Sequence, residues 1–145
     1  MSTVSRIDEK AILVILERAA DALRNKDLDA LGKCYTEDVR IFDIGSESIG
    51  FGKFRELWEA CLPDFPDSIE TRRKDVKVTF GDGVAVVTGF VRMSGMKTDH
   101  PCNRAWIRTT TCLRKFNGHW KIFHEHASMP VDCTRDSIAY LFDED

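Results

Sequence analysis

Two tight turns in the second half of the chain constrain its fold more than any other feature of the sequence. Gly81-Asp82-Gly83 and Asn117-Gly118 each separate two long runs in which apolar and polar residues alternate. Turns of this composition join adjacent antiparallel strands, because their residues accept the positive φ angles of a β-hairpin. The sequence therefore predicts four long strands, over residues 69–80, 84–94, 104–116 and 119–129.

The first half of the chain is predicted to be mostly helical. Apolar residues between Ile7 and Leu23 cover a face wider than that of a surface helix, so this helix is expected to be wrapped on several sides. Asp27 is placed to cap a short second helix, and residues 51–62 repeat apolar side chains at helical spacing until a proline ends them. A short strand is expected at residues 39–43. Helices followed by hairpin-linked strands favour an α+β fold with a mostly antiparallel sheet.

Composition favours a single-domain cytoplasmic protein. A length of 145 residues with 43% hydrophobic residues is enough for one domain with a core. The net charge of −3 argues against a nucleic-acid partner and a polybasic membrane anchor, and no apolar run approaches the roughly 20 residues of a membrane-spanning helix. The first residues lack the apolar stretch of a signal peptide. The five cysteines form no C-x-x-C pair, so we expect free thiols in a reducing compartment.

Alternation along the last three strands sorts their side chains into two faces. One face of each strand is apolar at one end and polar at the other, which suits a pocket with a hydrophobic floor. We assign this face to the interior, and its members toward the polar ends are Phe90, Arg92, Arg108, Thr110, His124, His126 and Ser128. The opposite face carries further apolar residues such as Ala85, Val87, Val91 and Met93. Because three helices cannot cover both faces, we expect a homodimer that forms through the outer face of the sheet.

The C-terminal hairpin resembles a known family. Residues 108–130 read R-x-T-x-x-L-R-K-x-x-G-x-W-x-I-x-H-x-H-x-S-x-P, which is similar to SnoaL-like proteins of the nuclear transport factor 2-like (ketosteroid isomerase-like) superfamily. The Gly-x-Trp turn and His-x-His strand also resemble the association (hub) domain of calcium/calmodulin-dependent kinase II. The resemblance implies a cone-shaped α+β domain over residues 1–130, with a curved sheet wrapped around N-terminal helices, and a tail at 131–145. It also implies a ligand pocket inside the cone and a dimer.

Asp43 and His126 are the candidate catalytic pair. Asp43 ends the first strand on its inward side, where apolar neighbours such as Phe54 and Trp58 can tune its pKa for a general base. His126 carries the side chain best suited to exchange protons near neutral pH. The alternatives are structural: Asp43 caps the turn that follows it or pairs with an inward arginine, and His124 or His126 hydrogen-bonds a neighbouring backbone group.

The other polar side chains on the predicted inward face are candidate ligand-binding groups. Arg92 and Arg108 would face a largely apolar cavity and need anions, so one of them could hold a ligand carboxylate or enolate. The alternative is an acidic partner at the rim, or solvent. The predicted substrate-binding set is completed by Phe54, Trp58, Phe90, Thr110, His124 and Ser128. A His-x-His pair can chelate zinc, but no third ligand lies at a suitable spacing, so neither a metal nor another cofactor is expected.

Two functions remain open. One is a cofactor-free isomerase, cyclase or dehydratase that uses acid–base chemistry on a small carbonyl-bearing or acidic substrate. The other is a non-catalytic module that binds small acids or mediates dimerisation, as the hub domain does. Ketosteroid isomerases place a tyrosine on the first helix, and residues 11–15 are all aliphatic here, so steroid isomerisation is not expected.

Overall fold

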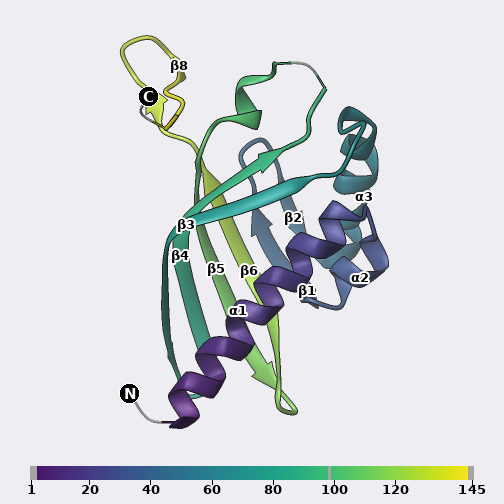
Figure 1. Ribbon diagram of the computed structural model, residues 1–145, viewed down its shortest axis with the longest axis vertical. Helices are drawn as coiled ribbons and strands as arrows, with labels where there is room; N and C mark the ends of the chain where they lie inside the picture. The colour runs from purple at the N-terminus through teal and green to yellow at the C-terminus, as the bar shows by residue number, and fades with distance from the viewer. Residues whose placement is uncertain (1–2, 98, 144–145) are drawn as a thin grey trace.

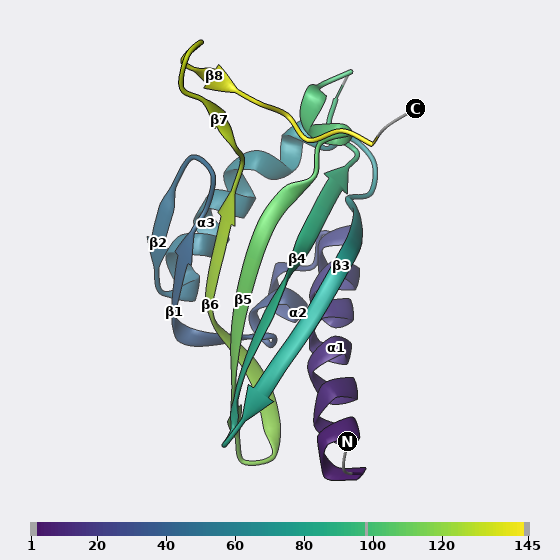
Figure 2. The ribbon, with the colours of Figure 1, turned by 90° about the vertical axis from the view of Figure 1, so that its left-hand side faces the viewer.

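Six strands form one sheet, and three helices lie on one side of it (Figures 1 and 2). The computed structural model describes residues 3–97 and 99–143. The helices are α1 (Thr3–Arg24), α2 (Leu28–Gly32) and α3 (Phe51–Cys61), with 3₁₀ turns at Leu62–Asp64 and Pro101–Asn103. The strands of the sheet are β1 (Tyr35–Phe42), β2 (Glu47–Ile49), β3 (Glu70–Gly81), β4 (Val84–Ser94), β5 (Ile107–Phe116) and β6 (His119–Ser128).

The strand order in the sheet is β2-β1-β6-β5-β4-β3, as Figure 2 shows from the side of the sheet. β1 runs parallel to β6, and every other neighbouring pair is antiparallel. The predicted α+β class with a mostly antiparallel sheet is therefore confirmed. The parallel pair arises because β6 returns beside β1 after three intervening long strands.

The two hairpins form where the sequence predicts them. Asp82 and Gly83 have φ angles of 47° and 75°, and Asn117 and Gly118 have 47° and 81°. Two successive positive φ angles are those of a type I′ turn, whose twist matches that of the strands it joins. These turns fix the register of β3 with β4 and of β5 with β6.

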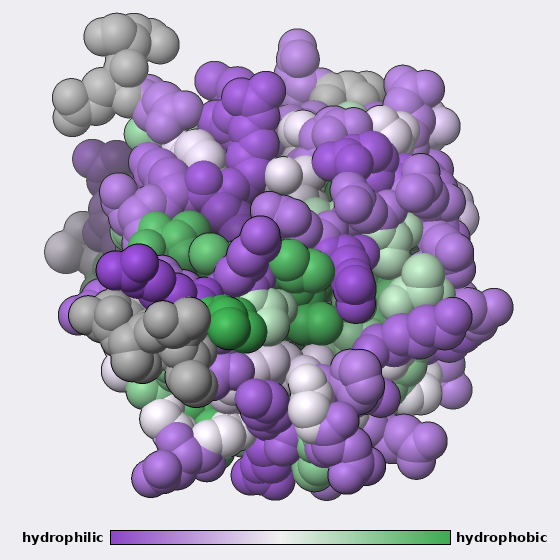
Figure 3. Space-filling view, turned by 60° about the horizontal axis from the view of Figure 1, so that its bottom comes forward, coloured by the Kyte–Doolittle hydropathy of each residue, from purple (hydrophilic) through white to green (hydrophobic). Residues whose placement is uncertain are grey.

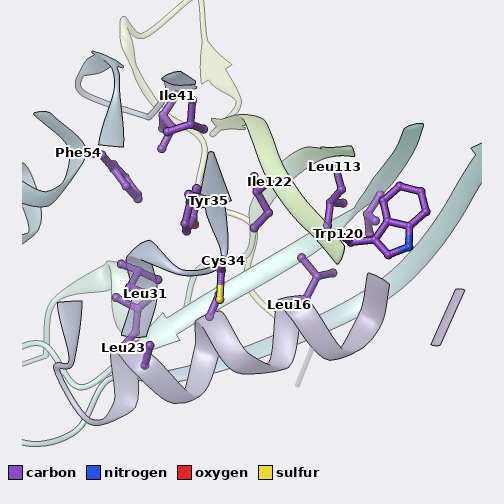
Figure 4. Packing of buried hydrophobic residues seen from close by; sticks show 14 of the residues in the cluster. Leu16, Leu23, Leu31, Cys34, Tyr35, Ile41, Phe54, Leu113, Trp120 and Ile122 are labelled. Atoms are coloured by element: carbon purple, nitrogen blue, oxygen red, sulfur yellow. The ribbon is translucent and has the colours of Figure 1, made fainter. Parts of the chain in front are cut away.

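The core lies between α1 and the inner face of the sheet (Figure 4). Leu16 of α1 points toward Leu113 and Ile122 of the sheet, and Leu23, further along α1, lies beside Leu31 of α2 in the same cluster. As predicted, Asp27 caps α2, because its Oδ1 accepts a hydrogen bond from Ala30 N at 3.0 Å. Apolar burial of this kind contributes roughly 25 cal/mol per Å² and is the main favourable term that holds the helices to the sheet.

A β-bulge in β6 changes which of its side chains face the helices. Ile122 pairs with Leu113 and His124 pairs with Cys112, so Phe123 is an extra residue without a partner. Because side chains alternate with a period of two, one extra residue moves all later side chains to the opposite face. The simple alternation assumed in the sequence prediction therefore holds only before Phe123.

The bulge overturns the inward position predicted for the later residues of β6. Trp120 and Ile122 are buried on the inner face, as expected. Beyond Phe123, however, Glu125 and Ala127 take the inner positions. The alternation therefore places three residues on the outer face: His124, His126 and Ser128.

On β4 and β5 the predicted faces are inverted. Ala85, Val87 and Val91 are buried on the inner face, whereas Arg92 lies on the outer face. The inner set of β4 is apolar throughout, so its burial removes more apolar surface from water than burial of the set that contains the arginine. The apolar residues that were predicted to form a dimer contact thus form the inner wall of the domain itself. The homodimer remains a prediction, but this apolar face no longer supports it.

A second bulge lies in β3 and explains a glycine on its neighbour. Lys74 pairs with Phe90 and Lys77 with Thr88, which leaves one extra residue in β3, and Asp75 has a φ of 54°. A Cβ atom on Gly89 would lie 3.1 Å from the carbonyl oxygen of Lys74. The bulge therefore needs a residue without a side chain at this position.

Several boundaries differ from the predicted ones. β1 begins at Tyr35 rather than at residue 39, and β5 begins at Ile107 rather than at residue 104. The three-residue strand β2 (Glu47–Ile49) lies in a segment for which the sequence predicts no element. Such short strands carry too little alternation to be recognised, and β2 is held by its pairing with β1.

The tail folds back onto its own domain. Its strands β7 (Val131–Asp132) and β8 (Ser137–Ile138) form a small hairpin that projects beyond the end of the sheet (Figures 1 and 2). Trp106 then anchors the tail: its backbone N donates to Leu141 O, and its Nε1 donates to Asp143 Oδ1, both at 2.7 Å. The sequence left open whether the tail covers the pocket or a partner, and the described part of it contacts the start of β5.

The end of the molecule where α1 begins carries a patch of apolar side chains among hydrophilic ones (Figure 3). A shallow groove between α1 and the β5–β6 turn is lined in part by Ile7, Val14 and Trp120. In the described part of the chain, no helix combines the length and the apolar character needed to cross a membrane.

Candidate functional site

A cavity of about 160 Å³ lies between the helices and the inner face of the sheet. Most of its wall is apolar and comes from α1, α3 and the central strands. Typical members are Ala19, Leu23, Phe54, Trp58, Val91 and Ile107. The polar groups in the wall are Tyr35, Asp43, Thr71, Arg73, Thr109, Thr111, Glu125 and His126. A few polar groups in an apolar enclosure are typical of a small-molecule site.

Glu125 is the central acid of this cavity. The bulge at Phe123 turns its side chain inward, where its Oε1 accepts a hydrogen bond from the Tyr35 hydroxyl at 2.9 Å. Burial raises the pKa of Glu125 to about 7, although the hydrogen bond from Tyr35 and the positive charge of Arg73 oppose the rise; the negative charge of Asp43 adds to it. Its carboxyl group is therefore close to half protonated at neutral pH, which suits a general acid or base.

Tyr35 holds Glu125 from the first position of β1. Its ring stacks on Phe51 at 5.5 Å and packs against Phe54 at 5.6 Å between ring centroids. Burial and the neighbouring Glu125 raise the pKa of the Tyr35 hydroxyl well above its usual value. The hydroxyl therefore remains protonated at neutral pH and acts as a hydrogen-bond donor in a fixed position.

Arg73 and Thr71 form the β3 side of the cavity. Burial lowers the pKa of the Arg73 guanidinium, and the negative charge of Glu125 opposes this effect. Within the described residues, the guanidinium makes no hydrogen bond and no ion pair. The hydroxyl of Thr71 is buried and likewise lacks a hydrogen-bond partner.

The predicted catalytic pair, Asp43 and His126, borders the same cavity but does not form a dyad. Asp43 is exposed, and its Oδ1 accepts a hydrogen bond from Ile44 N at 2.8 Å, so it caps the turn after β1, which was one of the alternatives. His126 is exposed and packs edge-on against Phe42, with ring centroids 5.5 Å apart. Within residues 3–97 and 99–143, no hydrogen bond or ion pair joins Asp43 to His126.

Phe54 and Trp58, two of the predicted substrate-binding residues, line the cavity. The sequence placed them correctly because helical spacing puts both on the face of α3 that packs toward Tyr35 and Phe65.

The other predicted ligand-binding residues lie outside the cavity because the face assignment was wrong. Arg92 pairs with Asp143 at 2.9 Å, and Arg108 Nε donates to Ser128 Oγ at 3.1 Å. His124 Nδ1 donates to the carbonyl oxygen of Arg40 at 2.7 Å, which is the backbone contact considered as its alternative. None of six predicted residues belongs to the cavity wall: Phe90, Arg92, Arg108, Thr110, His124 and Ser128.

The sequence prediction missed Glu125, Tyr35 and Arg73. The available signal for Glu125 was an acidic residue inside a strand that also carries buried apolar residues, since an ionised carboxyl group is rarely placed there without a reason. Tyr35 lies before the predicted start of the first strand, and Arg73 stands in a charged segment of β3 where alternation is weak. In the described parts of the chain, no three His, Cys, Asp or Glu side chains are close enough together to hold a metal ion.

Solved structures with the same fold extend over nearly the whole chain. An NTF2-like protein of unknown function from Pseudomonas putida KT2440 has a TM-score of 0.81 and 24% identity, covering 100% of this chain and 99% of the other. A candidate scytalone dehydratase from Novosphingobium aromaticivorans has a TM-score of 0.76 and 15% identity over 88% and 87% of the two chains. A candidate ketosteroid isomerase from Shewanella frigidimarina has a TM-score of 0.69 and 18% identity over 81% and 94%.

These similarities agree with the resemblance seen in the C-terminal hairpin. No curated protein matches the chain. The SnoaL-like domain, as a family, matches residues 12–132, which include α1 from its third turn onward, the entire sheet and the cavity. The chain therefore belongs to the SnoaL-like domain family.

Proposed function

We propose that this protein is a cofactor-free enzyme that moves a proton on a small carbonyl compound, with Glu125 as the general acid–base. The observation that carries the proposal is a carboxyl group with a pKa of about 7, fixed by Tyr35 inside an apolar cavity. Such a pKa keeps both protonation states available at neutral pH, and proton transfer by a group of this kind accelerates reactions by typically 10²–10⁴-fold. The candidate dehydratase and ketosteroid isomerase that share the fold support this class of reaction.

In the proposed reaction, the ionised Glu125 carboxylate takes a proton from the carbon next to the substrate carbonyl. The C–H electron pair moves into the substrate and forms an enolate, whose negative charge is stabilised through space by the nearby positive charge of Arg73. Protonated Glu125 then returns the proton to a different carbon, which completes an isomerisation without a net change in atoms or electrons. Tyr35 positions the carboxyl group throughout by its hydrogen bond.

The volume of the cavity limits the size of the substrate. About 160 Å³ is close to the roughly 150 Å³ of an engineered protein cavity that binds benzene. The proposed substrate is therefore about the size of one six-membered ring and smaller than a fused-ring steroid.

The alternative is a module that binds such a molecule without chemistry. Arg73 supports this alternative as well, because a bound anion would neutralise its charge even if no reaction followed. Proton exchange separates the two functions, because only an acid–base site exchanges carbon-bound hydrogen.

The test is deuterium exchange, measured by NMR, of single-ring carbonyl compounds incubated with the protein in D₂O. Wild-type protein should accelerate exchange next to the carbonyl group, and Glu125→Gln should lose about 10²–10⁴-fold of that rate. Glu37→Gln, which changes an exposed glutamate of β1, is the matched control and should retain the rate. Exchange that survives Glu125→Gln would remove the proposed acid–base residue, and compounds that bind without any exchange would favour the binding module.

A further inference from the structure

Arg73 is a charged group in the cavity wall without a counter-ion. Its side chain is half-buried, and it reaches both the cavity and the neighbouring groove between α1 and β3. The arginines Arg24, Arg55 and Arg92 each have an acidic partner within 4 Å. A charge withdrawn from water without such a partner is costly, so its position calls for an anion that binds there.

Thr71 adds a second unsatisfied donor beside Arg73. The two residues are separated by one residue on β3, pair with Met93 and Val91 of β4, and line the same cavity. The Thr71 hydroxyl is buried without a partner, and such a group costs about 1–3 kcal/mol until something accepts its hydrogen bond. A guanidinium and a hydroxyl that converge on one space can together bind the two oxygens of a carboxylate.

Glu125 acts on Arg73 through space, but no acid of the cavity pairs directly with its guanidinium among the described residues. Glu125 accepts a hydrogen bond from Tyr35, and Asp43 accepts one from Ile44 N. Neither lies within 4 Å of the guanidinium among the contacts of the described residues. Glu9, Glu17 and Asp21 line the neighbouring groove but do not pair with the guanidinium among the described residues either, so Arg73 is available to an anion from outside the chain.

We propose that Arg73 and Thr71 form an anion subsite that binds the carboxylate of a small, one-ring or similarly sized monocarboxylic acid. The subsite rests on the proposed function only in that the same molecule places its reacting carbon near Glu125. The subsite limits the substrate to a monocarboxylate whose carbonyl group or ring lies toward the apolar wall formed by Phe54 and Trp58.

Binding of a carboxylate at this subsite should be linked to proton uptake. The charged and titratable groups that line the cavity with Glu125 are Tyr35 from β1, Asp43 after β1, Arg73 from β3 and His126 from β6, whereas α1 and α3 contribute only apolar side chains. Arg73 at present favours the ionised form of Glu125. A bound carboxylate neutralises that influence and adds a negative charge, so Glu125 takes up a proton.

The experiment compares benzoate with benzamide, two probes of the same size that differ in charge, by isothermal titration calorimetry. Near pH 8, in two buffers of different ionisation enthalpy, benzoate should bind at least about tenfold more tightly than benzamide and take up a fraction of a proton. Arg73→Gln should weaken benzoate binding by about 10–100-fold, and Thr71→Val by about 2–10-fold, with little effect on benzamide. Arg72→Gln, the adjacent arginine on the outer face, should leave both affinities unchanged.

Equal affinities for the two probes, no benzoate binding at millimolar concentration, or a benzoate preference that survives both Arg73→Gln and Thr71→Val would overturn the subsite. If Arg73→Gln does not fold, the probe comparison in wild-type protein and in Thr71→Val decides. A benzoate preference in a protein that catalyses no Glu125-dependent exchange would sustain the subsite and remove the proposed function. Glu125-dependent exchange without a preference for benzoate over benzamide would support the proposed function and overturn the subsite.

Discussion

Two arginines on the outer face of the sheet and two polar residues on its inner face differ in whether they have a partner. On the outer face, Arg92 pairs with Asp143 and Arg108 donates to Ser128. On the inner face, Arg73 and Thr71 have no partner among the described residues. The two outer arginines therefore find partners within the fold, whereas the two inner donors remain available to a ligand.

This contrast separates groups that stabilise the fold from groups that cost stability. A hydrogen-bonded pair at the surface adds little or nothing to the free energy of unfolding, and it loses nothing when no ligand is bound. A buried group without a partner lowers the free energy of unfolding, so its position calls for an explanation. The inner polar groups are therefore the better candidates for function, although the outer ones include more residues of the kinds found in active sites.

The largest expected effect tests which face is buried. Val87→Lys places an amine among the helices and the inner wall, where Val87 is 3% exposed, and should cost at least about 3 kcal/mol of unfolding free energy or prevent folding. Val86→Lys, one residue earlier on the outer face, should cost about 1 kcal/mol or less, because its long side chain can reach water. Urea denaturation of the two variants measures the difference. Comparable losses at both positions would contradict the assignment of the faces.

The sequence predicted the elements of this fold well and their faces poorly, for a physical reason. Turn chemistry at Asn117-Gly118 is local, so it specifies a hairpin wherever it occurs. The choice of inner face on β4 is not local, because Val84 and Val86 on one side are as apolar as Ala85 and Val87 on the other. Only the packing of the helices decides between them.

The part of the candidate site on α3 was predicted most directly, while Asp43 and His126 reach only its border. Phe54 and Trp58 follow helical spacing and line the cavity as predicted. Glu125 was missed because the bulge at Phe123 cannot be recognised from alternation, which assigns the inward position to His126 instead. That Arg73 lacks a partner depends on contacts between distant strands, so no pattern within its own segment indicates it.

The next effect concerns the stability cost of the inner acid. The pKa of Glu125 is about 7 in the folded protein and about 4.3 in an unfolded chain. The folded state therefore binds more protons between these pH values, and stability falls as the pH rises through that window. Glu125→Gln should match wild type near pH 4.5 and exceed it by about 2 to 3 kcal/mol near pH 8.

Urea denaturation at the two pH values measures this gain. Glu37→Gln should show no such pH-dependent gain, because Glu37 is exposed on β1. A Glu125→Gln variant that is no more stable than wild type at the higher pH would show that the ionised Glu125 carboxylate does not lower the free energy of unfolding.

A smaller effect is expected at the hydrogen bond between Tyr35 and Glu125. This bond favours the ionised carboxylate, so Tyr35→Phe should raise the pKa of Glu125 further. Proton exchange catalysed by the variant should then begin at a higher pH than in wild type and recover in alkaline solution. A pH–rate profile checks this shift, and Tyr140→Phe in the tail should leave the profile unchanged. A lowered rate without a shifted profile would mean that Tyr35 acts on the substrate rather than on Glu125.

The smallest effect on the cavity is expected from the outer face. The hydrogen bond from Trp106, together with Arg92 and Lys74, holds the pKa of Asp143 below its usual range, so these contacts persist at neutral pH and weaken as the pH falls through that lowered pKa. Asp143→Asn removes the charge and should increase amide hydrogen exchange in residues 139–143, while benzoate affinity stays as in wild type. The tail residues are absent from the cavity wall, so releasing them should not reach Arg73 or Glu125. A change in benzoate affinity in this variant would mean that the two faces are coupled through β4, which carries Arg92 on one side and Val91 on the other.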